Sequence, residues 1–145
     1  MKSKLLILLT LFISLSNCSI DNNSTNNPPQ VIKIYWNLIN VSGGIAGVNE
    51  DFQSGTITWT FDEPTETLTI VNNNTNVNIE DGLDSGTYSY SILNVEDKSF
   101  LVLDSNELGS IELTTNQLTI NENIKSESNV ADGFIYLFSR TTITE

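Results

Sequence analysis

The strongest constraint on this chain is a side-chain period of two that recurs from residue 31 almost to its end. In "GTITWTFD" (residues 55–62), three apolar side chains alternate with threonines. Successive side chains of a strand point to opposite faces, so this pattern predicts a half-buried strand. Seven further segments carry strand patterns, and they are centred on Trp36, Leu68, Tyr88, Val102, Ile111, Leu118 and Tyr136. No segment shows convincing helical periodicity, so the sequence predicts an all-β domain.

The connections between these segments favour neighbouring antiparallel strands. Most are short and rich in Asn, Asp, Gly or Pro, such as "DEPTE" (residues 62–66) and "TTNQ" (residues 114–117). A meander of this length must deal with its two edge strands, and closure into a barrel removes both. We therefore expect an antiparallel up-and-down barrel of about eight strands. A two-sheet β-sandwich is the alternative.

The N-terminal residues have the pattern of a secretory signal. "MKSK" supplies two lysines, and the apolar run "LLILLTLFISL" that follows has 11 residues. A membrane-spanning helix needs about 20 apolar residues, so this run predicts a signal peptide. The next residues, "LSNC", resemble the lipobox of bacterial lipoproteins through Leu15, Ser16 and Cys18, with Asn17 where a small residue is usual. The resemblance implies cleavage before Cys18 and acylation of its thiol.

Composition supports this division of the chain. Cys18 is the only cysteine, so no intramolecular disulfide can form, and acylation would account for an otherwise unpaired thiol outside the cytoplasm. The alternative is a plain signal peptide followed by a free cysteine. "SIDNNSTNNPPQ" is too polar to fold and predicts a tether. We expect a signal peptide at residues 1–17, a disordered polar tether at 18–30 and a lipocalin-like barrel domain at 31–145. We expect the protein to be anchored in the cell envelope, with the outer membrane favoured over the inner.

The net charge and the residue composition exclude several classes of function. Without residues 1–17 the chain keeps four basic residues against 18 acids, a net charge of −14. Nucleic-acid affinity depends on neutralising phosphates with Lys and Arg, so we expect no nucleic-acid partner. The chain has no histidine, which excludes Ser-His and Cys-His catalysis and the usual zinc sites. We expect no metal, no cofactor and no enzymatic activity.

Three weaker patterns in the sequence resemble functional motifs but also fit ordinary turns. Adjacent carboxylates, such as Glu50 with Asp51, lie in turn-like segments where solvated loops are the rule. "DSNELGS" has calcium-type ligands, but Leu108 stands where a further ligand would be needed. "GGIAG" lacks the spacing of a dinucleotide loop and no helix follows it. Each pattern is therefore assigned to turn structure.

The first and last strand segments resemble those of lipocalin-like small β-barrels. Trp36 in "YWNLINVSGG" matches the tryptophan of the first strand, and Arg140 in "DGFIYLFSR" matches the basic residue of the last. Ile34 stands where the family has glycine. The resemblance, closest to lipocalin-like lipoproteins of Bacteroidetes, implies that Arg140 packs across Trp36 and closes one end of the barrel. A guanidinium on an indole face is favourable by about 0.5–2 kcal/mol.

An eight-stranded barrel can fill itself with side chains or hold one small ligand. The side chains expected to line its interior are Leu38, Trp59, Phe61, Ile70, Tyr88, Tyr90, Phe100, Val102 and Phe134. The family resemblance implies a lid in the loop after the first strand, and the candidate residues are Gly43, Gly44, Ile45, Gly47 and Asp51. We expect a monomeric lipoprotein that binds a small apolar or amphipathic ligand. The alternative is a filled-core module that binds protein or glycan.

Overall fold

The computed structural model describes residues 31–144. The predicted signal peptide, Cys18 and the predicted tether lie outside the described residues. Between Val31 and Thr144, no helix is long and apolar enough to cross a bilayer.

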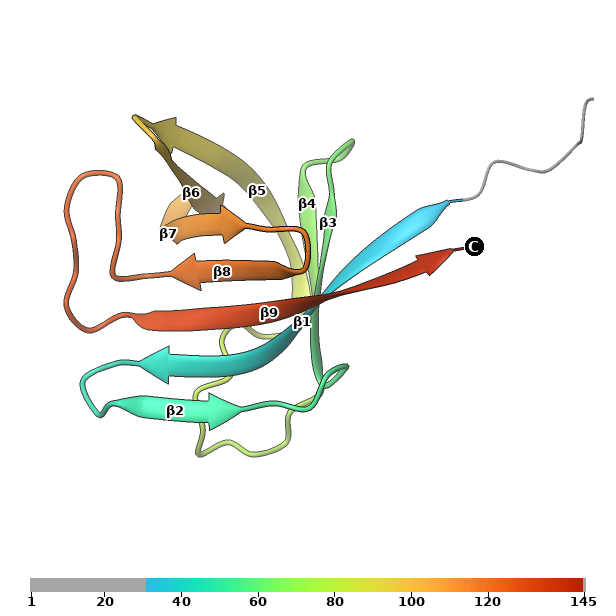
Figure 1. Cartoon of the computed structure of the whole chain (residues 1–145), viewed down its shortest axis with the longest axis horizontal. Coiled ribbons are helices and arrows are strands. Elements are labelled where there is room, and N and C mark those ends of the chain that lie inside the picture. The colour runs from blue at the N-terminus through green and yellow to red at the C-terminus, as the bar shows by residue number, and fades with distance from the viewer. Residues whose placement is uncertain (1–30, 145) are drawn as a thin grey trace, which may run out of the picture.

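Nine strands account for most of the described chain (Figure 1). They are β1 (Ile32–Gly43), β2 (Val48–Asp51), β3 (Ile57–Asp62), β4 (Thr67–Asn72), β5 (Gly86–Val95), β6 (Lys98–Leu103), β7 (Asn106–Leu113), β8 (Gln117–Asn121) and β9 (Phe134–Thr144). Hairpin turns join most of them, and several turn residues other than glycine adopt positive φ, including Asp104 and Ser105 between β6 and β7.

The sheet closes into an antiparallel up-and-down barrel, which confirms the predicted fold class. From β3 to β9 each strand pairs with its neighbour in sequence, and β1 pairs with both β3 and β9. The β1–β9 seam runs from Ile32 opposite Thr144 to Gly43 opposite Phe134, with one irregularity between Leu38 and Asn40. Because the first and last barrel strands are hydrogen-bonded to each other, the β-sandwich alternative is excluded.

Strand β2 is an addition that the sequence patterns did not predict. The segment after Trp36 was expected to leave its strand as a loop, but Val48–Asp51 pairs back onto the C-terminal half of β1. The side-chain amide of Asn40 donates hydrogen bonds to Asn49 Oδ1 at 3.0 Å and to Asp51 Oδ1 at 2.9 Å. Backbone pairing and polar cross-strand contacts hold β2 on β1. The strand therefore needs no alternating apolar residues, and its sequence shows no strand pattern.

The outer ends of β1 and β9 continue beyond the barrel as a two-stranded ribbon. Figure 1 shows this ribbon projecting away from the other strands. Its register pairs Ile32 to Tyr35 with Thr144 to Thr141. Val31, the first described residue, directly precedes this end of β1.

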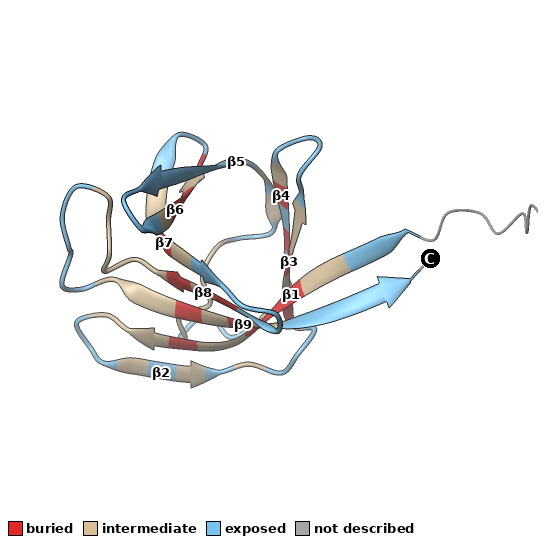
Figure 2. Ribbon diagram, turned by 45° about the horizontal axis from the view of Figure 1, so that its top comes forward, coloured by how far each residue is buried: buried red, intermediate tan, exposed pale blue. Residues whose placement is uncertain are grey.

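Buried hydrophobic residues from every barrel strand except β5 and β7 form the core of the barrel, and Figure 2 colours the buried positions red. Trp59 and Phe138 lie at its centre, with ring centroids 4.8 Å apart. The buried cluster consists of Trp36, Leu38, Val41, Ile57, Trp59, Leu68, Ile70, Leu101, Leu103, Leu118, Ile120, Tyr136 and Phe138. Burying apolar area contributes about 25 cal/mol per Å², so this cluster supplies the main driving force for closure.

Strand β6 corrects two of the predicted interior residues. Leu101 and Leu103 belong to the core, which places Phe100 and Val102 on the opposite face of the strand. Phe100 is nevertheless buried. The cross-strand partner of Phe100 on β7 is Ser110. The backbone N–H of Ser110 donates to the carbonyl of Ile124 at 2.9 Å. The long β8–β9 connection therefore runs over the outside of this part of the barrel, which explains why β6 is apolar on both faces.

The end of the barrel at the β4–β5 and β8–β9 connections is closed by a buried tyrosine. The Tyr136 hydroxyl donates to Glu122 Oε1 at 3.3 Å, and the other carboxylate oxygen of Glu122 accepts from the backbone N–H of Phe134 at 3.0 Å. Burial, followed by the negative charges of Glu122 and Glu80, raises the pKa of Tyr136 far above its ordinary value. The phenol therefore remains neutral in the folded protein.

This tyrosine predicts a loss of stability at alkaline pH. The unfolded state releases the Tyr136 proton near pH 10, while the folded state keeps it. The stabilising effect is complete below pH 10, and the free energy of unfolding should then fall by about 1.4 kcal/mol per pH unit. Urea denaturation between pH 9 and 11.5 should show a shallower fall for Tyr136→Phe, with Tyr35→Phe as control. Equal slopes for both variants would contradict this role.

Candidate functional site

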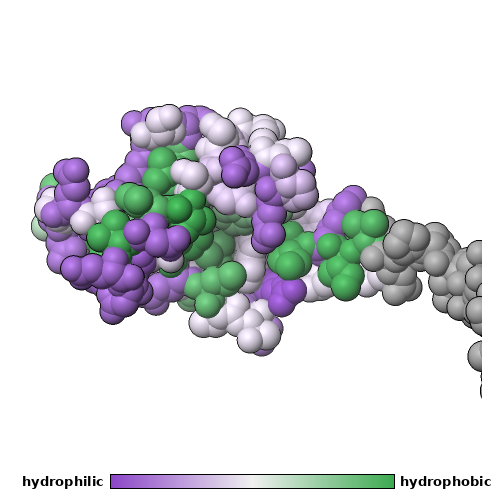
Figure 3. All heavy atoms as spheres, turned by 90° about the horizontal axis from the view of Figure 1, so that it is seen from above, coloured by the Kyte–Doolittle hydropathy of each residue, from purple (hydrophilic) through white to green (hydrophobic). Residues whose placement is uncertain are grey.

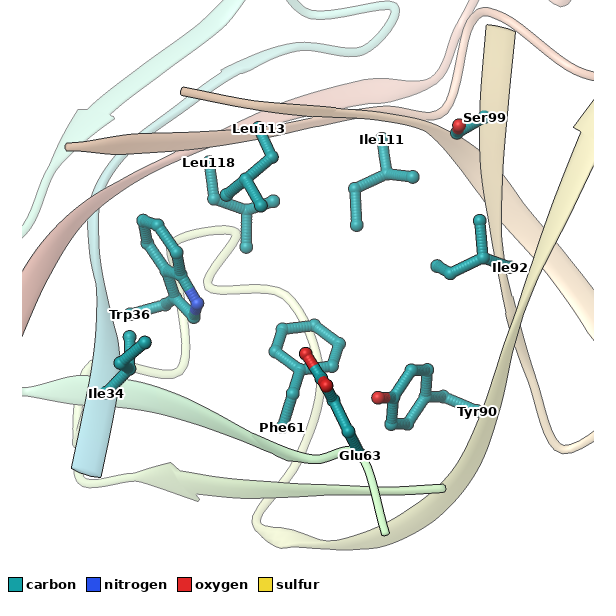
Figure 4. Close-up of a pocket in the computed structure, with 10 residues that line it drawn as sticks. All are labelled: Ile34, Trp36, Phe61, Glu63, Tyr90, Ile92, Ser99, Ile111, Leu113 and Leu118. Carbon is teal, nitrogen blue, oxygen red and sulfur yellow. The ribbon is translucent and has the colours of Figure 1, made fainter. Parts of the chain in front are cut away.

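An open pocket of about 490 Å³ lies at the end of the barrel opposite Tyr136 (Figure 4). The hairpins β3–β4, β5–β6 and β7–β8 surround this end, because alternate connections of an up-and-down barrel lie together. The residues that line the pocket are Ile34, Trp36, Phe61, Glu63, Tyr90, Ile92, Ser99, Ile111, Leu113 and Leu118.

The pocket walls are mainly apolar and include three aromatic rings. Phe61 and Tyr90 meet edge to face with ring centroids 5.0 Å apart, and Phe61 also approaches the core ring of Trp59 at 6.4 Å. Trp36 and Leu118 belong to the buried core as well as to the pocket wall. The pocket therefore ends on the packed core, and the aromatic contacts hold its walls in place.

Large aliphatic side chains at the rim of the pocket are exposed to solvent. Leu113 is 66% exposed and Ile92 is 41% exposed, although both also line the pocket. Seen from above, hydrophobic side chains (green) gather in the middle of the visible face with polar ones (purple) around them (Figure 3). Contiguous exposed apolar surface with a polar border is typical of binding sites.

Polar groups in the pocket are few. Glu63 follows β3, and its carboxylate extends toward the middle of the pocket (Figure 4). The Tyr90 hydroxyl also points inward. Partial burial, then the charges of Glu63, Glu66 and Asp62, raise the pKa of Tyr90 above its ordinary value. At neutral pH this end of the pocket therefore offers a carboxylate and a neutral phenol.

Trp36 and Arg140 are direct cross-strand partners in the β1–β9 seam. Trp36 lines the pocket, while Arg140 is exposed. The guanidinium donates from Nη1 to the carbonyl oxygen of Thr115 at 3.2 Å, and the Arg140 backbone N–H donates to Asn116 at 3.0 Å. The guanidinium of Arg140 is thus hydrogen-bonded to the β7–β8 hairpin, and its packing across Trp36 stays a prediction.

The other predicted lining residues fall into two groups. Leu38, Trp59 and Ile70 are buried in the core and fill the barrel below the pocket. Tyr88 and Phe134 pack partly against the core but lie outside the pocket wall. The Tyr88 hydroxyl donates to the carbonyl of Asp84 at 2.9 Å. Of the predicted interior set, the pocket brings together Phe61 and Tyr90, and Trp36 joins them.

The predicted lid lies at the other end of the barrel. Gly43 ends β1, Gly44 and Ile45 belong to the turn, and Gly47 precedes β2. Seven residues separate Gly43 from Trp36, about 23 Å along a strand at 3.3 Å per residue. Asp51 holds Asn40 on β1 and is also far from the pocket wall. As a cover for this pocket, the lid prediction is therefore wrong.

Several pocket residues were not among the sequence candidates. Ile111 and Leu118 mark predicted strands but are not among the predicted interior residues, and Ile92 belongs to the strand segment centred on Tyr88. Ile34, Ser99, Leu113 and Glu63 lie at strand ends or in a hairpin, and periodicity alone does not say which barrel end opens. The signal that could have identified Glu63 is its place one residue after the "TITWTFD" strand.

A second hollow, about 530 Å³, lies along the β4–β5 connection and is polar. Asn72, Asn74 and Asn76 each accept a hydrogen bond at Oδ1 from the backbone two residues ahead, at 2.9–3.1 Å. These contacts shape the loop itself. In the part of the chain that the structure describes, no group of three or more metal-ligating side chains comes together.

A scan against protein-family models, a search of curated proteins and a search of solved structures each gave no match. The site is therefore interpreted from its own geometry and chemistry.

Proposed function

We propose that this protein is an envelope-anchored lipoprotein whose barrel binds one small apolar or amphipathic molecule in the open pocket. The observation that carries this proposal is an apolar pocket of about 490 Å³ with exposed aliphatic residues at its rim. Small-molecule sites are typically 300–1,000 Å³, mostly apolar, with a few placed polar groups. The role is binding without catalysis, and the barrel acts as a monomer.

Pocket occupancy can be tested with decanol, a neutral apolar probe. Trp36 lines the pocket, so its fluorescence should change as the probe enters. The change should saturate at one probe per chain. A linear, non-saturating response would contradict the proposal and would favour the alternative of a module that binds protein or glycan through its surface.

The proposed anchor predicts the behaviour of a Cys18→Ser variant. Acylation needs the Cys18 thiol, and several acyl chains are required for a stable anchor. In the native host, wild-type protein should sediment with membranes and should label with radioactive palmitate. The variant should lose at least about 90% of that label, because its serine hydroxyl cannot replace the thiol. Equal labelling of both proteins would contradict acylation at Cys18.

A further inference from the structure

We infer that the ligand of the pocket is an organic cation, a protonated amine or quaternary ammonium that carries an apolar tail. This inference rests on the proposed function and names the chemical class of its ligand. Three observations support it, namely a carboxylate at the mouth, three aromatic rings in the pocket wall, and the lack of any basic residue among the ten lining residues.

The carboxylate is supplied by Glu63. This residue lies in the β3–β4 hairpin, and in Figure 4 its side chain extends from the hairpin toward the pocket, with its carboxylate overlapping the ring of Phe61 in this view. Glu63 is exposed at the mouth, and its negative charge attracts an opposite charge that comes close to it. A bound ammonium group would provide that charge.

The aromatic rings provide the second part of a cation site. Trp36, Phe61 and Tyr90 all line the pocket, and they come from three different strands. The faces of aromatic rings carry partial negative charge and attract ammonium groups, and quaternary ammonium ligands are commonly held in cages of such rings. Phe61 and Tyr90 are fixed at 82° to each other, so they offer differently oriented surfaces.

No base among the ten lining residues would oppose a cation. The nearest base by register is Arg140, which shares the face of its partner Trp36 but does not line the pocket and donates to the Thr115 carbonyl. Lys98 is next to Ser99 in β6, but successive residues of a strand face opposite sides, so its side chain leaves on the outside.

The surroundings of the mouth are acidic. Asp62, Glu63 and Glu66 all belong to the β3–β4 hairpin and its start, and the field of all three reaches the Tyr90 hydroxyl. The chain from Cys18 onward carries 18 acids and four bases. Such a field concentrates cations near the pocket and repels carboxylates. A fatty acid would therefore bring its charge against Glu63.

The aliphatic residues of the pocket wall offer a binding surface for the apolar tail of the ligand. Ile111, Leu113 and Leu118 line the pocket on β7 and β8, on the side away from Glu63 and Tyr90 in Figure 4. These aliphatic side chains fit a hydrocarbon tail, which gains by leaving water. Glu63, Phe61 and Tyr90 thus lie on one side of the pocket and these three aliphatic residues on the other, with Trp36 next to Leu118, an arrangement that suits an amphipathic cation.

The test compares three probes with the same ten-carbon chain, namely decylammonium, decanol and decanoate, each titrated into the full chain below its micelle concentration. Decylammonium should bind about tenfold more tightly than decanol, and decanoate should bind most weakly. Glu63→Gln should weaken decylammonium binding about tenfold and should change decanol binding by a much smaller factor, because decanol carries no charge. The matched control is Glu112→Gln, the same change at an exposed residue on the outside of β7.

The possible outcomes separate this inference from the proposed function. Equal binding of decanol and decylammonium, unchanged by Glu63→Gln, would overturn the cation site while the apolar pocket stands. Tightest binding of decanoate would also overturn it. Failure of all three probes to bind would instead contradict the proposed function. An equal loss with Glu112→Gln would show that general acidity, and not Glu63, attracts the cation, and would overturn the assignment.

Discussion

Replacing Phe138 with alanine is expected to lower the free energy of unfolding by about 3–5 kcal/mol. Phe138 is 0% exposed and lies in β9, where it is the partner of Leu38 across the closing seam and of Leu118 on β8. Its ring also packs on Trp59 at 4.8 Å. Truncation removes apolar contacts to three strands and leaves a cavity that the closed barrel cannot collapse to fill.

Urea denaturation followed by tryptophan fluorescence measures this loss. Ile45→Ala is the control, because Ile45 is 87% exposed in the β1–β2 turn, and its free energy of unfolding should change by less than about 0.5 kcal/mol. A loss below about 1 kcal/mol for Phe138→Ala would contradict a core centred on the β1–β9 seam.

Replacing Ser99 with tryptophan is expected to weaken binding of decanol at least about tenfold, since a bulky indole would occupy the space that a ligand needs. Ser99 is the small residue of the pocket wall and lies on β6 opposite Asn94, to which its hydroxyl donates at 2.7 Å. Loss of this exposed hydrogen bond costs little, so the free energy of unfolding should fall by no more than about 1 kcal/mol.

The matched control for this variant is Ser91→Trp. Ser91 is exposed on β5 between Tyr90 and Ile92, both of which line the pocket, so its own side chain leaves on the outer face. It should bind decanol as the wild type does. Isothermal titration at equal protein concentration compares the variants, and unchanged affinity for Ser99→Trp would show that the probe binds elsewhere.

Most of the fold could be predicted from the sequence because the barrel strands are half-buried. Alternation around Trp59, Tyr136 and Leu118 identified strands correctly, and tight turns identified their neighbours. Phe100 was assigned to the wrong face of its strand. Because β6 is apolar on both faces, side-chain alternation does not show which face points into the barrel, and the β8–β9 connection that covers the outer face is not visible in the sequence pattern. Strand β2 is held by backbone and polar pairing, which hydrophobic patterns do not report.

The candidate site was only partly predictable. Phe61 and Tyr90 could be assigned to the interior by phase, and Trp36 to one end of the barrel by family resemblance, and all three line the pocket. The alternation of side chains shows which face of a strand points inward, but not how far along the barrel axis a side chain lies. The buried core residues Trp59 and Ile70 could therefore not be distinguished from the pocket residue Phe61. Glu63 lies in a hairpin, and only closure of the barrel turns its side chain over the mouth.

The most direct test of a ligand-binding barrel is to isolate the full-length protein from its native host and extract it with organic solvent. Mass spectrometry of the extract should find one small molecule at near-stoichiometric amount in the wild type and in Ser91→Trp, and should find it strongly depleted in Ser99→Trp. A basic nitrogen in that molecule would agree with the role inferred for Glu63. Extracts without a bound molecule, or with the same molecule at equal amounts in all three proteins, would contradict a ligand held in this pocket.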